Sequence, residues 1–272
     1  MKKIIIPFDG GQFSKGAFSF ASSLHEIEPI LLTGIFLPAV EYARFLFFPT
    51  SFAAPVFISG SEDFDEKEIN SNVEKFSKLC QNNMIEYRVH KDLLDSSMAQ
   101  LSKETRFADL MIIGSETFYT NGIVEGPTEY LKDALHDTEC PVVIVPEKFD
   151  FPSNIILAYD GSKSSVFAIK QFALLFPELC DLKIDLVYGG DEEDNIPDQA
   201  LIEELASRHF TNLTITKLCD NINDIPDWFD RHKNSMVVSG SFGRSGLSKL
   251  FIKSLILDLI KENKTPVFIA HV

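Results

Sequence analysis

The sequence lacks the long apolar runs and the surplus of basic residues that mark membrane-spanning and nucleic-acid-binding proteins. Its longest apolar runs, such as PVVIVP and NIILAY, are far shorter than the roughly 20 residues of a transmembrane helix. The 40 Asp and Glu residues outnumber the 25 Lys and Arg residues, and the resulting net charge of −15 repels polyanions in general. We therefore expect neither a membrane nor a nucleic acid as a partner.

The sequence also lacks the usual signatures of secretion, metal binding and hydrolysis. The start, MKKIIIPFDGG, has neither the apolar length nor the cleavage site of a signal peptide, which predicts a cytoplasmic protein. The four cysteines form no C-x-x-C pair, so neither a zinc site nor a redox dithiol is indicated. Walker A, H-E-x-x-H and G-x-S-x-G motifs are absent, and no catalytic or metal-binding residue is predicted.

The sequence contains an internal repeat. IIIPFDGGQFSKGAFSFASSL matches IILAYDGSKSSVFAIKQFALL, with Asp9 aligned on Asp160 and Ser14 on Ser165. Two later blocks recur in the same order, one placing Gly114 on Gly240 and the other Pro141 on Pro266. A chain of 272 residues is long enough for two domains, and the stretch PEKFDFPSN interrupts the apolar pattern between them. The predicted domains are residues 1–148 and 149–272.

Short β-branched runs alternate with stretches of helical periodicity in the second half. Apolar strands separated by helices favour a parallel sheet covered on both faces, which is a doubly wound α/β fold. We expect a five-stranded parallel sheet in each half, and pairing of the two domains through their last strands, PVVIVP and PVFIAHV. The predicted strands are 154–159, 183–188, 213–218, 235–239 and 266–270, and the predicted helices are 163–176, 197–209, 223–232 and 247–262.

Doubly wound sheets bind ligands beyond the carboxyl ends of their strands, so residues that follow strands are the candidates. Asp160 follows the first strand of the second half and would also serve as an ordinary cap of the next helix. Val187 is predicted at the rim of the second strand, as a ligand contact or an ordinary strand-end residue. Gly240 opens a glycine-rich stretch after the fourth strand, where backbone N–H groups and a helix start would suit phosphate.

The stretch GSFGRSGLSKLFIKS resembles the nucleotide-binding motif of the universal stress protein family. That motif is G-x-x-G, nine residues, then Gly and Ser or Thr, and Gly240, Gly243, Lys253 and Ser254 occupy its frame. The DG after the first strand and TPVFIA in the last strand also resemble the family, over nearly the whole chain and in both halves. The resemblance implies two tandem Rossmann-like domains of the adenine nucleotide alpha hydrolase-like type, with ATP as the ligand and Mg²⁺ as its companion.

The resemblance also implies roles for particular residues. Asp160 and Val187 would hold adenosine, and Gly240, Gly243 and Ser254 would hold the phosphates. Arg244 and Lys253 would add positive charge to this site, although Lys253 replaces the usual glycine and would either block or bind the phosphates.

The first half departs further from the motif. Thr117 stands at the second glycine, Pro127 offers no backbone N–H, and three glutamates lie nearby, so we expect a scaffold domain without nucleotide. A Phe-rich segment, residues 42–58, is predicted either as a protein-partner surface or as local core.

Three functions follow from these observations. The first is a nucleotide-binding stress-response module with its site in the second domain. The second is a structural or protein-interaction module with both sites degenerate, and the third is a slow ATPase. A homodimer remains an option for the assembly.

Overall fold

The computed structural model describes residues 1–9, 13–37, 62–91, 97–115, 138–190, 193, 195–218, 228, 232, 234–240 and 265–270. By the contacts between its residues, the chain divides into two compact units, Met1–Cys140 and Pro141–Val272. The division falls before the expected boundary at residue 148, because the strand that begins at Val142 pairs with a strand at the end of the chain.

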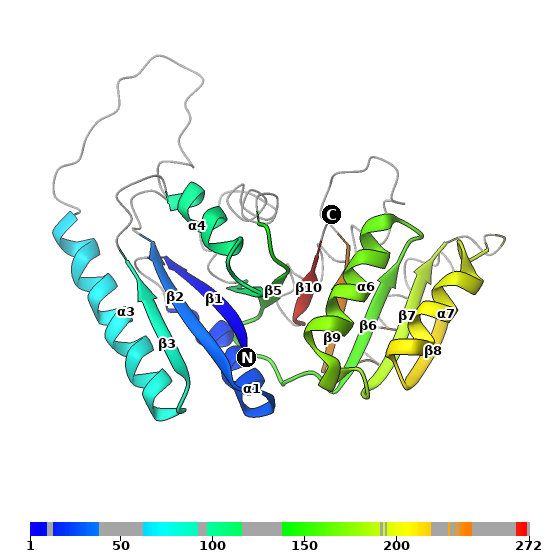
Figure 1. Ribbon diagram of the computed structural model, residues 1–272, viewed down its shortest axis with the longest axis horizontal. Coiled ribbons are helices and arrows are strands. Elements are labelled where there is room, and N and C mark those ends of the chain that lie inside the picture. Colours follow the sequence, from blue (N-terminus) through cyan, green and yellow to red (C-terminus); the bar gives the residue numbers. More distant parts are fainter. Residues whose placement is uncertain are drawn as a thin grey trace, which may run out of the picture. The chain divides into compact units, whose positions relative to one another are not determined.

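The first unit is a parallel sheet with helices between its strands (Figure 1). Its described strands are arranged in the order β3-β2-β1-β4. The elements in chain order are β1 (Lys2–Asp9), α1 (Lys15–Ile27), β2 (Ile30–Leu37), α3 (Glu62–Asn82), β3 (Glu86–His90), α4 (Ser97–Thr105) and β4 (Leu110–Gly114).

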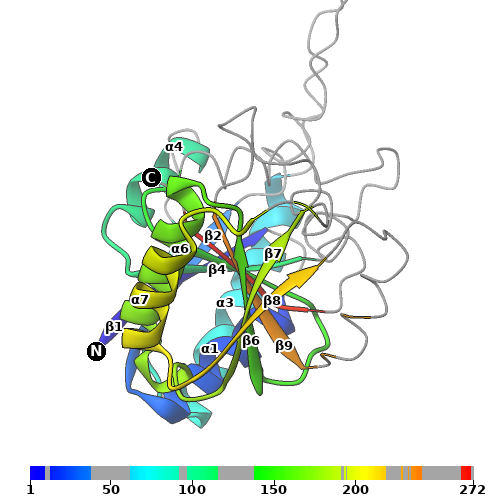
Figure 2. The ribbon, with the colours of Figure 1, turned by 90° about the vertical axis from the view of Figure 1, so that its right-hand side faces the viewer.

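The second unit repeats this topology. Its strands are arranged in the order β5-β10-β9-β6-β7-β8, and every pair except β5 with β10 is parallel. The elements in chain order are β5 (Val142–Val145), β6 (Asn154–Tyr159), α6 (Lys163–Leu175), the 3₁₀ turn η2 (Pro177–Leu179), β7 (Lys183–Gly189), α7 (Gln199–His209), β8 (Asn212–Leu218), β9 (Ser235–Ser239) and β10 (Val267–Ile269). Helices α6 and α7 lie on the same face of this sheet (Figure 2).

The alternation of apolar strands and helices therefore predicted the doubly wound α/β fold correctly. All five strands expected in the second half form, and so do the helices expected at 163–176 and 197–209. The helices expected at 223–232 and 247–262 lie outside the described residues, apart from Trp228 and His232. The continuous apolar runs are buried as a parallel sheet requires, with Ile4, Ile5 and Ile6 fully buried in β1.

Five described strands come from each sequence repeat, as expected, with β1 to β5 in the first and β6 to β10 in the second. Val142–Val145 is the fifth strand of the first sequence repeat, but it pairs antiparallel with β10 and belongs to the second unit. The registered pairs run from Val267 with Ile144 to Ile269 with Val142. The two last-strand segments thus pair with each other, as expected from their apolar, β-branched character, which makes an unpaired edge unfavourable.

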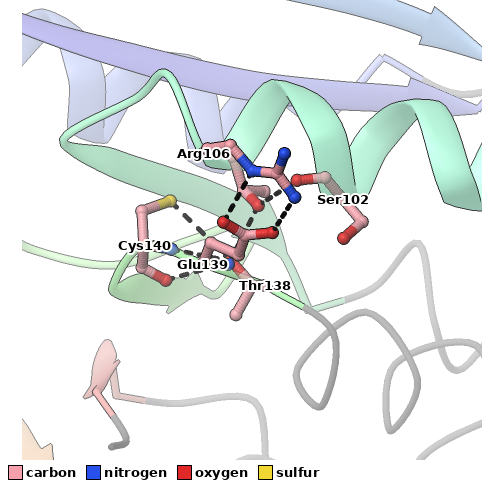
Figure 3. Close-up of polar contacts among 6 residues, drawn as sticks. Ser102, Arg106, Thr138, Glu139 and Cys140 are labelled. Atoms are coloured by element: carbon pink, nitrogen blue, oxygen red, sulfur yellow. Dashed lines mark hydrogen bonds and ion pairs between the residues drawn. The ribbon is translucent and has the colours of Figure 1, made fainter.

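A polar cluster holds the end of α4 to the residues that precede β5 (Figure 3). Arg106 donates two hydrogen bonds to the Glu139 carboxylate, at 2.8 and 2.7 Å. The Thr105 hydroxyl accepts from the Glu139 N–H at 2.9 Å and donates to the Ser102 carbonyl at 2.6 Å. Thr138 donates to the Cys140 carbonyl at 3.0 Å. This cluster fixes the path of the chain between α4 and the start of β5, the last strand of the first sequence repeat.

Candidate functional site

The candidate site lies at the carboxyl edge of the sheet in the second unit. From β6 the chain adds β7 and β8 on one side, and β9 then lies on the other side of β6. Strand order therefore reverses between β6 and β9, the place where open α/β sheets form a ligand crevice. Asp160 follows β6 and Gly240 follows β9, so the fold brings these two predicted residues to that place.

The turn after β6 is built around Asp160 and Gly161. The Asp160 Oδ1 atom accepts a hydrogen bond from the Ser162 N–H at 2.9 Å, which is an Asx turn. Gly161 has a φ of +78°, a left-handed conformation that favours glycine. Among the described residues, no group hydrogen-bonds to the Asp160 Oδ2 atom. Asp160 thus shapes the turn before α6, whereas the cap of that helix is Ser162 and not Asp160 as expected.

Helix α6 presents its amino-terminal end at this edge. The Ser162 hydroxyl oxygen accepts from the Ser165 N–H at 3.1 Å and caps the helix. In the first unit Ser14 has the same role and accepts from the Ala17 N–H at 3.2 Å. The sequence repeat had aligned Ser14 with Ser165, but Ser165 lies in the first turn of α6. The helix of the second unit therefore starts earlier relative to its strand, which brings its positive end closer to Asp160.

Gly240 packs directly against that first turn of α6. A Cβ atom at this position would lie 2.5 Å from the Ser164 carbonyl carbon, 2.5 Å from the Ser165 nitrogen and 2.8 Å from the Ser164 oxygen. All three are backbone atoms that cannot rotate away, so only glycine fits without a shift of β9 or α6. The first glycine of the predicted motif is thus required for packing, and it lies beside the start of α6.

The chain before α7 lies over the same turn. The Tyr159 hydroxyl donates to the Pro197 carbonyl at 2.8 Å, and a Cβ on Gly161 would lie 2.7 Å from the Pro197 Cβ. Burial raises the pKa of the Tyr159 phenol, with smaller contributions from the nearby charges of Asp198 and Asp160. Any ligand at Asp160 would have Pro197 as a neighbour. No sequence pattern indicated Tyr159 or Pro197 at this place, and only the DG pair indicated a tight turn at Gly161.

Val187 does not lie at the rim where the sequence analysis placed it. It pairs with Ala158 of β6 on one side and with Thr216 of β8 on the other. Strand β7 continues beyond Val187 to Gly189. The Val187 side chain is 6% exposed. Beyond the strand, the Gly190 N–H still donates to the Leu218 carbonyl, at 3.2 Å. The carboxyl end of β7 is therefore formed by Gly189, with Gly190 following it, because β8 extends the ladder further than the apolar run suggested.

Several predicted residues lie outside the described part of the chain. These are Gly243, Arg244, Lys253 and Ser254 of the motif, the Phe-rich segment 42–58, and Thr117 and Pro127 of the first half.

The corresponding strand ends of the first unit carry aromatic rings. Phe8 near the end of β1 stacks on Phe36 of β2 with ring centroids 5.0 Å apart, and on Phe13 at 4.8 Å. Phe76 of α3 packs edge-on against Phe8 and Phe36, at 5.7 and 5.9 Å. The Lys75 ammonium lies 4.2 Å from the centre of the Phe13 ring. The two units thus share a topology but differ in chemistry at the same edge.

No group of three or more His, Cys, Asp or Glu side chains in the described ranges is arranged to hold a metal ion. None of the described helices is both long and apolar enough to span a membrane.

Comparison with known proteins identifies the fold. No protein-family profile matches the chain, and no curated protein matches it. The chain is similar to the crystal structure of a universal stress protein from Archaeoglobus fulgidus DSM 4304, with a TM-score of 0.68 and 12% identity over 99% of this chain and 98% of that one. It is also similar to a putative universal stress protein from Pseudomonas aeruginosa UCBPP-PA14, with a TM-score of 0.57 and 11% identity over 99% and 93%. The fold of this protein is therefore that of the universal stress proteins, as its sequence motifs predicted.

Proposed function

We propose that the second unit binds an adenine nucleotide, ATP in the first place, at the crevice between the ends of β6 and β9. The observation that carries this proposal is the contact of Gly240 with the backbone of Ser164 and Ser165. It sets the start of the glycine-rich stretch beside the positive end of α6, and backbone amides at a helix start are a favourable place for phosphate.

The described residues fit such a ligand in two respects. The Asp160 Oδ2 atom is an acceptor without a hydrogen bond from the described residues, and suits a ribose hydroxyl or an adenine amino group. The close approach at Gly240 keeps side-chain atoms away from the place where phosphate would lie. Gly243 and Ser254 would add donors to the phosphates, and Arg244 and Lys253 would offset part of the net charge of −15. Magnesium would arrive with the nucleotide.

This site supports binding and regulation rather than efficient chemistry. None of the described residues at the crevice is a histidine, and the Asp160 carboxylate is held in its turn by Ser162. A stress-response module that changes state when ATP is bound is the corresponding role, in the cytoplasm.

A structural or protein-interaction module is the second candidate. The observation that favours it is the packing of Pro197 on Gly161 and Tyr159, which fills space beside Asp160. The deep position of Val187 points the same way, because its backbone lies within the ladders of β6 and β8.

Calorimetric titration of the full chain with ATP separates the two candidates. We expect one site per chain, its loss in Gly243→Glu, and its retention in Leu174→Glu. Leu174 is 65% exposed near the far end of α6, so this control adds the same charge away from the crevice. At a free ATP concentration of 100 times Kd, binding would also raise the free energy of unfolding by about 2.7 kcal/mol. No heat and no thermal protection at millimolar ATP would leave the interaction module as the function.

A further inference from the structure

A buried ionic cluster lies at the opposite, amino-terminal edge of the sheet in the second unit. Asp185, near the start of β7, is 3% exposed. In the sheet β6 lies between β7 and β9, and a hydrogen bond of 2.7 Å from the Asn154 amide to the Ser235 hydroxyl joins the first residues of β6 and β9. The Ser235 hydroxyl in turn donates to the His232 carbonyl. The cluster has no part in the proposed nucleotide site, which lies at the other end of the strands.

The Asp185 Oδ2 atom is buried and accepts no hydrogen bond from the described residues. Two basic groups lie near it, the Lys183 Nζ atom at 3.2 Å and the His232 Nε2 atom at 3.6 Å. The Lys183 side chain is 58% exposed and the His232 side chain only 17%, so water screens the lysine much more than the histidine. A buried carboxylate oxygen without a hydrogen bond is unfavourable, and a donor from His232 would satisfy it.

The hydrogen bond of the His232 Nδ1 atom decides whether Nε2 carries a proton in the neutral ring. His232 Nδ1 lies 2.7 Å from the Trp228 carbonyl oxygen, which can only accept, so Nδ1 carries a proton. In the neutral ring Nε2 then presents a lone pair to the Asp185 carboxylate, and the two repel each other. A second proton turns this contact into a charge-assisted hydrogen bond. The indole of Trp228 stacks on the imidazole with centroids 3.8 Å apart and holds the ring in this orientation.

We propose that His232 and Asp185 form a proton-operated latch, in which protonation of the imidazole ties His232 to β7 just before β9 begins. The charged groups that face the pair are Lys183 and Asp185 on β7, while β6 and β9 contribute the neutral groups of Asn154 and Ser235. A divalent metal ion is disfavoured at this place, because the Lys183 ammonium already lies beside the same carboxylate oxygen.

Trp228 is the single tryptophan of the chain, so its fluorescence reports on the latch. A charged imidazolium over the indole face interacts with the ring electrons and lowers the emission. Titrating the full chain from about pH 8 to pH 5, the range in which imidazoles gain a proton, should lower the emission. We expect His232→Gln to abolish this change and His209→Gln to leave it as in the wild type. Asp185→Asn should alter this change in emission, because the protonated ring loses its partner.

A second measurement covers the case in which Asp185→Asn does not fold. The urea midpoint of the wild type should exceed that of His232→Gln by more at pH 5.5 than at pH 8, because only the protonated latch adds stability. An equal difference in urea midpoint at the two pH values would overturn the proposal. The proposal would also be overturned if the emission of Asp185→Asn or His232→Gln changed with pH as it does in the wild type. If EDTA changed the pH dependence of the wild-type emission, a metal ion would hold His232 and Asp185 together, and the proposal would be wrong.

Discussion

Replacing Gly240 by alanine tests whether the motif's first glycine is required for packing. The new Cβ would lie 2.5 Å from two backbone atoms of Ser164 and Ser165, whereas ordinary contacts begin near 3.4 Å. The end of β9 or the start of α6 must therefore move by roughly an ångström, and such overpacking costs about 1–3 kcal/mol. For a protein of this size, each kcal/mol lowers the melting temperature by roughly 2–4 °C.

The assay is urea unfolding followed by circular dichroism, together with ATP titration of the same protein. Val238→Ala is the matched control, because Val238 is fully buried in the same strand and its truncation lowers stability by leaving a cavity. We expect both variants to be destabilised, and Gly240→Ala to weaken ATP binding more than Val238→Ala does. A Gly240→Ala protein as stable as the wild type, within about 0.5 kcal/mol, would refute the packing argument.

Three further predictions concern other parts of the fold. Gly161→Ala should lower the free energy of unfolding by about 1–2 kcal/mol through its left-handed conformation alone, and by more through the contact with Pro197, as measured by urea unfolding. Burial raises the pKa of the Cys140 thiol from 9.0 to about 12. The contribution of the neutral thiol to stability is therefore complete below pH 9 and is lost as the pH rises towards 12. Thiol reagents should label Cys140 only when the protein unfolds. The hydrogen bonds from Arg106 lower the pKa of Glu139, so their contribution is present above pH 4.5 and is lost as the pH falls, and Arg106→Ala should raise the Glu139 pKa in an NMR titration.

Much of the fold could be predicted from local sequence patterns. The apolar runs of β6, β7 and β9 predicted strands, and the observed bounds of these strands differ from the expected ones by at most one residue. Such runs are informative because burial on both faces demands continuous apolar character, whatever the rest of the chain does. The serine that caps α6 also lies where cap preferences place it, three residues before a backbone N–H that needs an acceptor. By its contacts β5 groups with the second unit, because it pairs with β10, which is distant along the chain.

The candidate site was predicted only in part. Asp160 and Gly240 follow the neighbouring strands β6 and β9, because parallel strands end at one edge of the sheet. Val187 was placed too close to the rim, since the length of β7 depends on how far β8 continues beside it.

The sequence by itself determined the α/β class, the repeated topology and the residues that follow the strands, because each depends on neighbours along the chain. Only the tertiary structure decided the contacts between distant segments. It set Gly240 against the first turn of α6, Pro197 over Gly161, and His232 beside the buried carboxylate of Asp185. These contacts depend on strand order, register and the paths of the connections, which no local pattern of residues specifies.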